Sequence, residues 1–305
     1  MNKKRIKHLF IHNWEWMLLC MPAIIGYLLF HYIPMIGLIL PFTDFRINLG
    51  LFGSQWNNFR NFEFIFGSVD LFRIVRNTVG YSLAGMIISP IFTMGMALLL
   101  FELTNRKVLK FIQTVYIFPT FMSWIVISFI THAILSPRLG ILSQVLEVFG
   151  ITNFDAYLTR GIWPYIMISL PIWRGVGMGS IIYYAALMGI DPQLYEAARI
   201  DGASRRQCVR YISIPMLIPL YTILLILSIG NIFTGNFELF YQIPRQVTYL
   251  LPVTDIIETY VFRGLQGGHL AVSAAVGLIQ SVVGFVLVLA TNRVVAVLAP
   301  ENRLF

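Results

Sequence analysis

Six long apolar stretches constrain this chain more than any other feature of its sequence. A helix needs about 20 mostly apolar residues to cross a bilayer, and six stretches meet this requirement: 16–40, 78–101, 110–135, 163–188, 212–235 and 270–292. Charged residues make up 12% of the 305 residues, whereas an average soluble domain carries about 25%. The chain cannot cover these stretches with its own polar surface. We therefore predict an all-α membrane protein with six transmembrane helices in a single domain, residues 1–305.

The distribution of lysine and arginine predicts the orientation of the six spans. Cytoplasmic loops of membrane proteins carry an excess of these residues. If the N-terminus lies inside, the inner segments hold thirteen of them and the longer outer segments hold eight. We therefore predict that both termini face the cytoplasm. The net charge of +8 then reflects topology, and its expected partner is anionic membrane lipid rather than nucleic acid.

The loop of residues 190–211, between the fourth and fifth spans, carries the signals of a short helix. Asp191 is a good N-cap, and Pro192 suits the first helical position. Gly202 fits the left-handed residue that ends such a helix, and Ser204 can cap a second helix that enters the fifth span. The loop is either a docking helix for a partner protein or an ordinary re-entry loop with good caps.

This loop resembles the EAA loop of the permeases of type I ABC importers. The matching pattern is Glu196-Ala197-Ala198, three residues, Gly202, nine residues, Ile212, one residue and Ile214-Pro215. The family usually has leucine where Ile214 stands. Other segments are similar to the carbohydrate branch of the family and to its polysaccharide or lipo-oligosaccharide permease subfamily: LYEAARIDGAS (194–204), IWRGVG (172–177), YIPMI (32–36), FGSQW (52–56), RNT (76–78), GNFELF (235–240), 255–263 and 275–292. The resemblance thus covers nearly the whole chain.

The resemblance implies a permease subunit of an ATP-driven importer that moves an oligo- or polysaccharide across a bacterial plasma membrane by alternating access. In this family two permeases, usually different, form the pathway. Two ATPase subunits each receive one EAA helix, and an extracellular lipid-anchored protein delivers the solute. ATP and magnesium belong to the ATPase. The residues that the resemblance assigns to coupling with the ATPase are Leu194, Tyr195, Glu196, Ala197, Ala198, Asp201, Gly202, Ala203 and Pro215.

The sequence lacks the motifs of an enzyme. It has no phosphate-binding loop of the form G-x-x-x-x-G-K-[ST], and no two histidines are expected at metal-ligand spacing on a shared helix. We therefore expect no catalytic residue, metal site or cofactor in this chain. Two alternatives remain. A transporter driven by an ion gradient would need an acid buried in a span and inverted repeats, and an ABC permease for a non-sugar solute would carry the same EAA loop.

Polar and aromatic residues within the spans are candidates for the transport pathway. An ionisable group such as Arg174 inside a bilayer is a functional candidate, although it could instead snorkel outward or bond carbonyls freed by Pro171. Amides and aromatic rings at the end of the fifth span suit an uncharged polyol, although they could simply cap a helix. The predicted pathway residues are Trp173, Arg174, Asn231, Phe233, Asn236, Phe237, Glu238 and Gln280.

Two further patterns concern packing and the outer surface. Small residues recur on one face of the sixth span and predict close helix or subunit packing: Ser273, Gly277, Ser281 and Gly284. Residues 59–76 mix aromatic and charged side chains, which predicts an amphipathic helix at the membrane interface. Aromatic residues also recur in the 236–269 loop. Both outer segments could anchor the protein in the membrane or contact an external binding protein or sugar.

Overall fold

The computed structural model describes residues 14–137, 140–151 and 154–298. The chain forms two compact units: Met1–Gly67 with Gly264–Leu278, and Ser68–Arg263 with Ile279–Phe305. The basic N-terminal segment and Arg303, which entered the orientation prediction, lie outside the described residues.

Within the described residues, five helical stretches are long and apolar enough to cross a membrane. They are Trp14–Phe42, Val69–Phe101, Arg160–Met188, Arg205–Ile229 and Leu270–Arg293. A sixth span results if the bent pair Arg106–Phe121 and Trp124–Leu135, which turns through 99°, counts as one. The predicted all-α membrane class is confirmed. Several limits differ from the expectation. The second helix begins at Val69 rather than at residue 78, and the fifth stretch covers Arg205–Ile229 rather than residues 212–235.

The first unit consists of one long helical stretch and a small hairpin. Its elements are α2 (Trp14–Tyr27), the π-helix η1 (Leu28–Tyr32), the 3₁₀-helix η2 (Ile33–Phe42), β1 (Thr43–Asp44), α3 (Gly50–Gly53), β2 (Gln55–Trp56) and α4 (Arg60–Phe66). The two strands are antiparallel, with Thr43 opposite Trp56. The Asn61 amide donates hydrogen bonds to the carbonyls of Pro41 and Thr43, at 2.8 and 3.0 Å, and so joins α4 to the end of η2.

The predicted interfacial helix over residues 59–76 is wrong in its extent. Helix α4 ends at Phe66, and α5 (Val69–Phe101) begins after a new N-cap at Ser68, whose hydroxyl accepts a hydrogen bond from the Asp70 N–H at 3.1 Å. Because a serine N-cap starts a fresh helix, the arginines at 73 and 76 belong to a long apolar helix instead.

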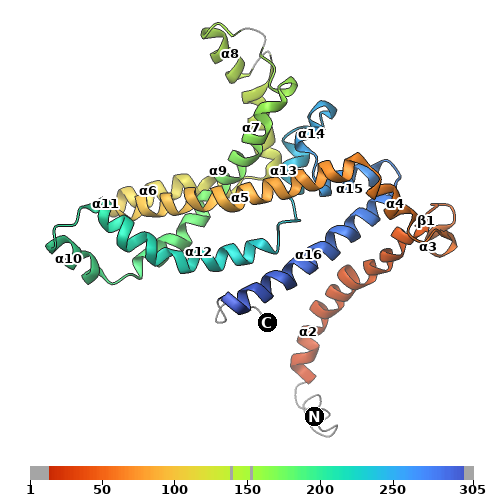
Figure 1. Ribbon diagram of the computed structural model, residues 1–305, viewed down its shortest axis with the longest axis horizontal. Helices are drawn as coiled ribbons and strands as arrows, with labels where there is room; N and C mark the ends of the chain where they lie inside the picture. Colours follow the sequence, from red (N-terminus) through yellow and green to blue (C-terminus); the bar gives the residue numbers. More distant parts are fainter. Residues whose placement is uncertain (1–13, 138–139, 152–153, 299–305) are drawn as a thin grey trace. The chain divides into compact units, whose positions relative to one another are not determined.

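The second unit holds the remaining elements (Figure 1). After α5 come α6 (Arg106–Ile117), η3 (Phe118–Phe121), α7 (Trp124–Leu135), α8 (Ile141–Val148), η4 (Ala156–Leu158), η5 (Arg160–Ile162) and α9 (Trp163–Met188). Then follow α10 (Pro192–Ile200), α11 (Arg205–Cys208), the π-helix η6 (Val209–Ser213), α12 (Ile214–Ile229), α13 (Phe237–Gln242), η7 (Thr248–Leu250), α14 (Leu251–Thr254) and α15 (Ile257–Gln266). Helix α15 and helix α16 (Leu270–Leu298) each have residues in both units.

Two clusters of buried side chains hold the second unit together. The larger one includes Trp124, Trp163 and Leu239 and joins α7, α9 and α13. The smaller one joins the ends of α5 and α9 to the beginning of α12, through residues such as Leu187 and Leu217. Figure 1 shows α10 and α11 at the same end of α5 and α12 as this smaller cluster. The loop that contains α10 and α11 thus lies at the ends of α5, α9 and α12.

Candidate functional site

Helix α10 is capped at both ends as the sequence predicts. The Asp191 carboxylate accepts a hydrogen bond from the Gln193 N–H at 2.9 Å. At the other end Gly202 has φ +84°. The Gly202 N–H donates to the Arg199 carbonyl at 3.1 Å, and the Ala203 N–H donates to the Ala198 carbonyl at 2.8 Å. These two bonds form a Schellman motif, which terminates the helix firmly.

The chain leaves α10 through a second cap. The Ser204 side chain accepts from the Gln207 N–H, and the Gln207 side chain accepts from the Ser204 N–H, so α11 starts with a capping box. Helix α12 follows after one π turn, with Pro215 at its second position. Because α11, the π turn and α12 form one continuous helical stretch, this proline removes one backbone hydrogen bond from it.

Tyr195 attaches α10 to the long helices. Its hydroxyl lies 2.9 Å from the Ser213 hydroxyl, and its ring centroid lies 5.8 Å from that of Phe101 at the end of α5. The ring also packs against the buried cluster that contains Leu187 and Leu217. The structure therefore places this predicted coupling residue on the inner side of α10, where it fixes the helix to α5, α9 and α12.

The opposite side of α10 is exposed and partly apolar. Ile200 is 86% exposed and Leu194 is 47% exposed, although both lie in an otherwise polar loop. The other predicted coupling residues on the exposed surface are Glu196, Ala197, Asp201 and Gly202, whereas Ala198 and Ala203 are half-buried. Branched apolar side chains in water are costly, so this surface has the composition of a docking site.

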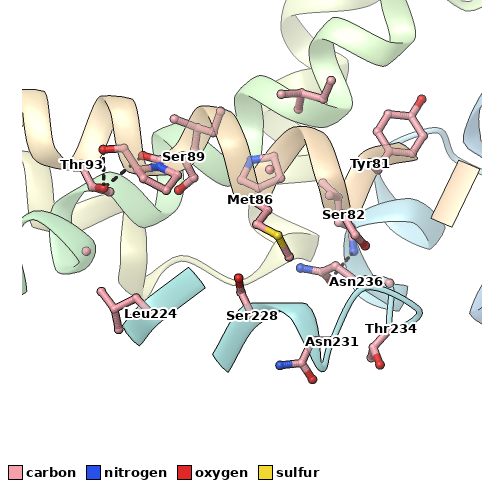
Figure 2. Close-up of a pocket in the computed structure, with 18 of the residues that line it drawn as sticks. Tyr81, Ser82, Met86, Ser89, Thr93, Leu224, Ser228, Asn231, Thr234 and Asn236 are labelled. Atoms are coloured by element: carbon pink, nitrogen blue, oxygen red, sulfur yellow. Dashed lines mark hydrogen bonds between the residues drawn. The ribbon is translucent and has the colours of Figure 1, made fainter. Parts of the chain in front are cut away.

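A cavity of about 500 Å³ lies between α5, α9, α12 and the segment 230–236. Figure 2 shows Met86 of α5 and Ser228 of α12 pointing toward each other across it. The polar side chains that line the cavity are Thr78, Tyr81, Ser82, Ser89, Thr93, Tyr183, Tyr221, Ser228, Asn231, Thr234 and Asn236. None of the residues that line it carries a charged side chain. Hydroxyls, amides and apolar surface suit a solute with many neutral hydroxyl groups.

Only Asn231 and Asn236, of the eight predicted pathway residues, line this cavity. Arg174 lies elsewhere, at the bend between η3 and α7. Its Nε donates a hydrogen bond to the Met122 carbonyl at 3.0 Å, and its guanidinium lies 4.8 Å from the centre of the Trp124 ring. Its side chain thus bonds a carbonyl, but at this bend rather than beside Pro171. Trp173 is 44% exposed.

The other four predicted pathway residues lie around the segment that connects α12 to α13. The Gln280 amide donates to the Phe233 carbonyl at 2.6 Å and to the Glu258 carboxylate at 2.7 Å. Phe237 packs against Tyr241 and Phe262, with ring centroids 5.2 and 5.0 Å away. Glu238 is exposed in the first turn of α13. A role for these side chains in the pathway stays a prediction.

Sequence reasoning missed the wall of the cavity that α5 contributes. Thr78, Ser82, Ser89 and Thr93 line it and are spaced by four, seven and four residues. This spacing places them on one face of a helix. Their periodicity could therefore have predicted a polar face of α5 that lines a cavity. Glu258 was also missed, because no local pattern in the sequence around α15 marks it.

The small residues on one face of α16 differ in how closely they are packed. Ser273 is buried and packs closely against Gly264. A Cβ atom added at Gly277 or at Gly284 would meet no atom within 4 Å, and Ser281 is exposed. Subunit packing at this face stays a prediction.

The end of α5 opposite α10 is held by a buried ionic cluster. Asp255 is fully buried and lies 3.1 Å from Arg73 and 2.6 Å from Arg263, measured between carboxylate oxygen and guanidinium nitrogen. The Thr259 hydroxyl donates to the same carboxylate at 2.9 Å. Burial raises the pKa of the neighbouring Tyr260 hydroxyl, and the negative charge of Asp70 raises this pKa further. The cluster ties α5 to the segment before α15.

Membrane-length helices around a cavity lined by uncharged side chains are the arrangement of a membrane permease. The chain belongs to the family described as binding-protein-dependent transport system inner membrane component, whose family model matches residues 91–303. The resemblance seen in the sequence is therefore confirmed. Membership in this family speaks against the alternative of a transporter driven by an ion gradient.

Relatives and solved structures agree with this assignment. The polygalacturonan/rhamnogalacturonan transport system permease protein YteP of Bacillus subtilis (strain 168) is 34% identical over 278 residues, which cover 90% of this chain and 86% of YteP. Protein LplB of the same organism is 32% identical over 284 residues, with 92% and 88% covered. A chain of a bacterial ABC transporter involved in the import of the acidic polysaccharide alginate has a TM-score of 0.85 and 30% identity, with 97% of this chain and 99% of that chain covered. The alginate transporter solved with an alginate pentasaccharide-bound periplasmic protein has a TM-score of 0.82 and 30% identity, with 95% and 97% covered.

Proposed function

We propose that this chain is one permease subunit of an ATP-driven importer that moves an oligo- or polysaccharide across a bacterial plasma membrane. The observation that carries the proposal is the geometry of α10. This helix is capped at both ends, exposes Leu194 and Ile200, and is fixed by Tyr195 to the helices that line the cavity. The exposed face of α10 could bind a separate ATPase subunit. The face that carries Tyr195 would transmit the movement of that subunit to the helices that line the cavity.

The proposed mechanism follows from these attachments. Closure of an ATPase pair would displace α10, and Tyr195 would pass this displacement to the ends of α5 and α12 through Phe101 and Ser213. The same two helices line the cavity farther along their length. A ligand-driven shift between two arrangements of these helices would open the cavity to alternate sides of the membrane. ATP and magnesium would act in the partner, and this chain would supply the docking surface and one wall of the pathway.

The assembly that the proposal requires contains two ATPase subunits, a second and different permease, and an extracellular lipid-anchored binding protein. Two similarities to known proteins support parts of it. The family is described as binding-protein-dependent, and a similar transporter was solved with a sugar-bound periplasmic protein. Both termini would lie in the cytoplasm, among anionic lipids.

A saccharide is the cargo that the cavity and the relatives support best. The lining offers neutral hydroxyl and amide groups beside apolar surface, which match the hydroxyl groups and C–H faces of a sugar. Polygalacturonan, rhamnogalacturonan and alginate are the cargoes in the descriptions of similar proteins. A non-sugar solute is the alternative, and competition tests the two. Excess oligogalacturonate or alginate oligosaccharide should reduce the uptake of a labelled pectic oligosaccharide, whereas an amino acid mixture should not.

Crosslinking tests the docking role of α10. Ala197→Cys places a thiol on the exposed face, and a short bifunctional reagent should join it to an ATPase subunit in membranes that accumulate the solute. Phe149→Cys, which is also exposed but follows α8 on the predicted outer side, is the matched control and should not react with the ATPase. Equal yields from the two positions, or no product from Ala197→Cys during active uptake, would contradict the proposal.

A further inference from the structure

The segment 230–236, between α12 and α13, forms part of the cavity wall without being helical. Helix α12 ends at Ile229, and α13 starts only after the N-cap Asn236. Asn231, Thr234, Gly235 and Asn236 of this segment line the cavity. The N–H groups of Asn231, Ile232 and Thr234 make turn hydrogen bonds to carbonyls three residues back. The Gly235 N–H and the Phe233 carbonyl instead bond side chains from other parts of the chain.

That support comes from a carboxylate behind the segment. Glu258 Oε1 accepts a hydrogen bond from the Gly235 N–H at 2.6 Å and another from the Gln280 amide at 2.7 Å. The same Gln280 amide donates to the Phe233 carbonyl at 2.6 Å. The Glu258 carboxylate therefore binds the Gly235 N–H of the segment, and the Gln280 amide binds its Phe233 carbonyl. Hydrogen bonds to an ionised acceptor are about twice as strong as neutral ones.

Position 235 requires glycine, because a side chain there would collide with the groups that hold the segment. A Cβ atom added there would lie 2.5 Å from Ile256 Cδ1 and 2.7 Å from Glu258 Oε2. The backbone of the segment therefore packs directly against the Glu258 carboxyl group at Gly235. Oε2 itself is buried and has no hydrogen-bond partner among the described residues, so Glu258 faces the segment rather than solvent.

We propose that Glu258 is a positioning residue for solute recognition: it fixes segment 230–236 so that Asn231, Thr234 and Asn236 present their polar groups to the solute. The part that concerns the solute rests on the proposed function. Gln280 completes the arrangement by linking the segment and Glu258 to α16. Neither residue lines the cavity, so both act through the residues that do.

A labelling experiment on the whole transporter tests this role without relying on transport. In a background with Cys20→Ser and Cys208→Ala, Thr234→Cys reports on the segment and Ser89→Cys reports on the α5 wall of the same cavity. A small polar thiol reagent is applied to membranes that carry Glu258, Glu258→Gln or Glu258→Ala. Loss of hydrogen bonds to a charged acceptor should change the labelling rate of Thr234→Cys by about tenfold.

The controls separate positioning from general damage. Ser89→Cys should be labelled at the same rate in all three backgrounds, and Glu258→Gln should stay close to the parent because its amide oxygen still accepts both hydrogen bonds. Gln280→Leu, which leaves the carboxylate in place, should change the rate at Thr234→Cys but not at Ser89→Cys. An unchanged rate at Thr234→Cys in both Glu258→Ala and Gln280→Leu, or an equal change at Ser89→Cys, would overturn the proposal.

Uptake measurements give a second readout. Glu258→Ala should lower the maximal rate of saccharide uptake at normal membrane abundance, while the ATPase response to the loaded binding protein persists, and Glu258→Gln should restore uptake. An unaltered uptake rate in Glu258→Ala would count against the recognition role. Failure of the parent transporter to take up any saccharide would instead refute the proposed function, whereas the labelling result would still decide whether Glu258 positions the segment.

Discussion

At the scale of single residues, two positions show how a local requirement explains a choice of amino acid. Gly202 has φ +84°, a backbone conformation that costs other L-residues about 1–2 kcal/mol. A Cβ atom there would meet no atom within 4 Å, so the requirement concerns the backbone and not space. Arg174 lies inside an apolar region, where its guanidinium has a carbonyl and an aromatic face as partners. Such contacts reduce the cost of a charge in a membrane.

Substitution of Gly202 tests whether the end of α10 matters for coupling. Gly202→Val should destabilise the Schellman motif by about 1–2 kcal/mol and lower the amount of solute taken up per ATP hydrolysed. Gly202→Asn should behave much more like the parent, because asparagine adopts the left-handed conformation more readily than other residues. The measurement is the ratio of uptake to ATP hydrolysis in proteoliposomes. Full coupling in a correctly inserted Gly202→Val protein would show that the termination of α10 is not required.

At the scale of elements, the bent span is held against α9 by several contacts. Thr120 donates to the Arg174 carbonyl at 2.8 Å, and the hydroxyls of Ser180 and Tyr116 lie 3.0 Å apart. At Gly177 the two backbones approach most closely, because an added Cβ would lie 2.5 Å from the Tyr116 carbonyl oxygen. These contacts hold the first arm of the bent span, α6 and η3, against α9 next to the 99° turn.

Two glycines of α9 offer a matched test of this contact. Gly177→Ala should destabilise the protein by about 1–3 kcal/mol, because the new methyl group meets the backbone of α6 and one helix has to move. Gly175→Ala, two residues earlier, should be neutral or slightly stabilising, since an added Cβ has open space and alanine favours a helix over glycine by about 1 kcal/mol. Thermal unfolding of the purified transporter compares them. Equal melting temperatures would exclude a tight contact at Gly177.

At the scale of the whole molecule, the sequence predicts the apolar helices and the cap residues of α10 well, because both depend on local chemistry. The length of an apolar run predicts a membrane span. Asp191 and Gly202 are residue types that typically begin and end a helix. The break between Phe121 and Trp124 was not predicted, since an apolar run of the right length reads as one straight helix. The cavity was predicted only in part: Asn231 and Asn236 lie in a visible polar cluster, whereas Glu258 reaches Gly235 from 23 residues away. Such pairings depend on tertiary contacts that no local pattern reveals.

The buried Asp255 cluster joins parts of the chain that are 182 residues apart, so its loss should affect global stability. Asp255→Ala should cost about 1–3 kcal/mol, because Arg263 and the Thr259 hydroxyl would lose a buried acceptor, whereas Arg73 would keep its ion pair with Asp70 at 2.9 Å. Asp44→Ala removes an exposed ion pair with Arg46 and should cost less than about 1 kcal/mol. Denaturation of the two variants in detergent measures the difference. Similar losses from both would mean that the Asp255 cluster contributes no more than a surface pair.

The uncharged lining of the cavity has a consequence for how the negative charge of an acidic sugar is balanced during transport. A uronic acid unit that passed Ser228 and Met86 would find no counter-charge on this wall. Its carboxylate would then be neutralised elsewhere, by a sodium or calcium ion that enters together with the sugar or by a basic side chain of the facing permease. In the first case one sodium ion would enter with each acidic residue, or one calcium ion with every two. A chelator or a change of salt would then alter the uptake of acidic chains but not of neutral ones.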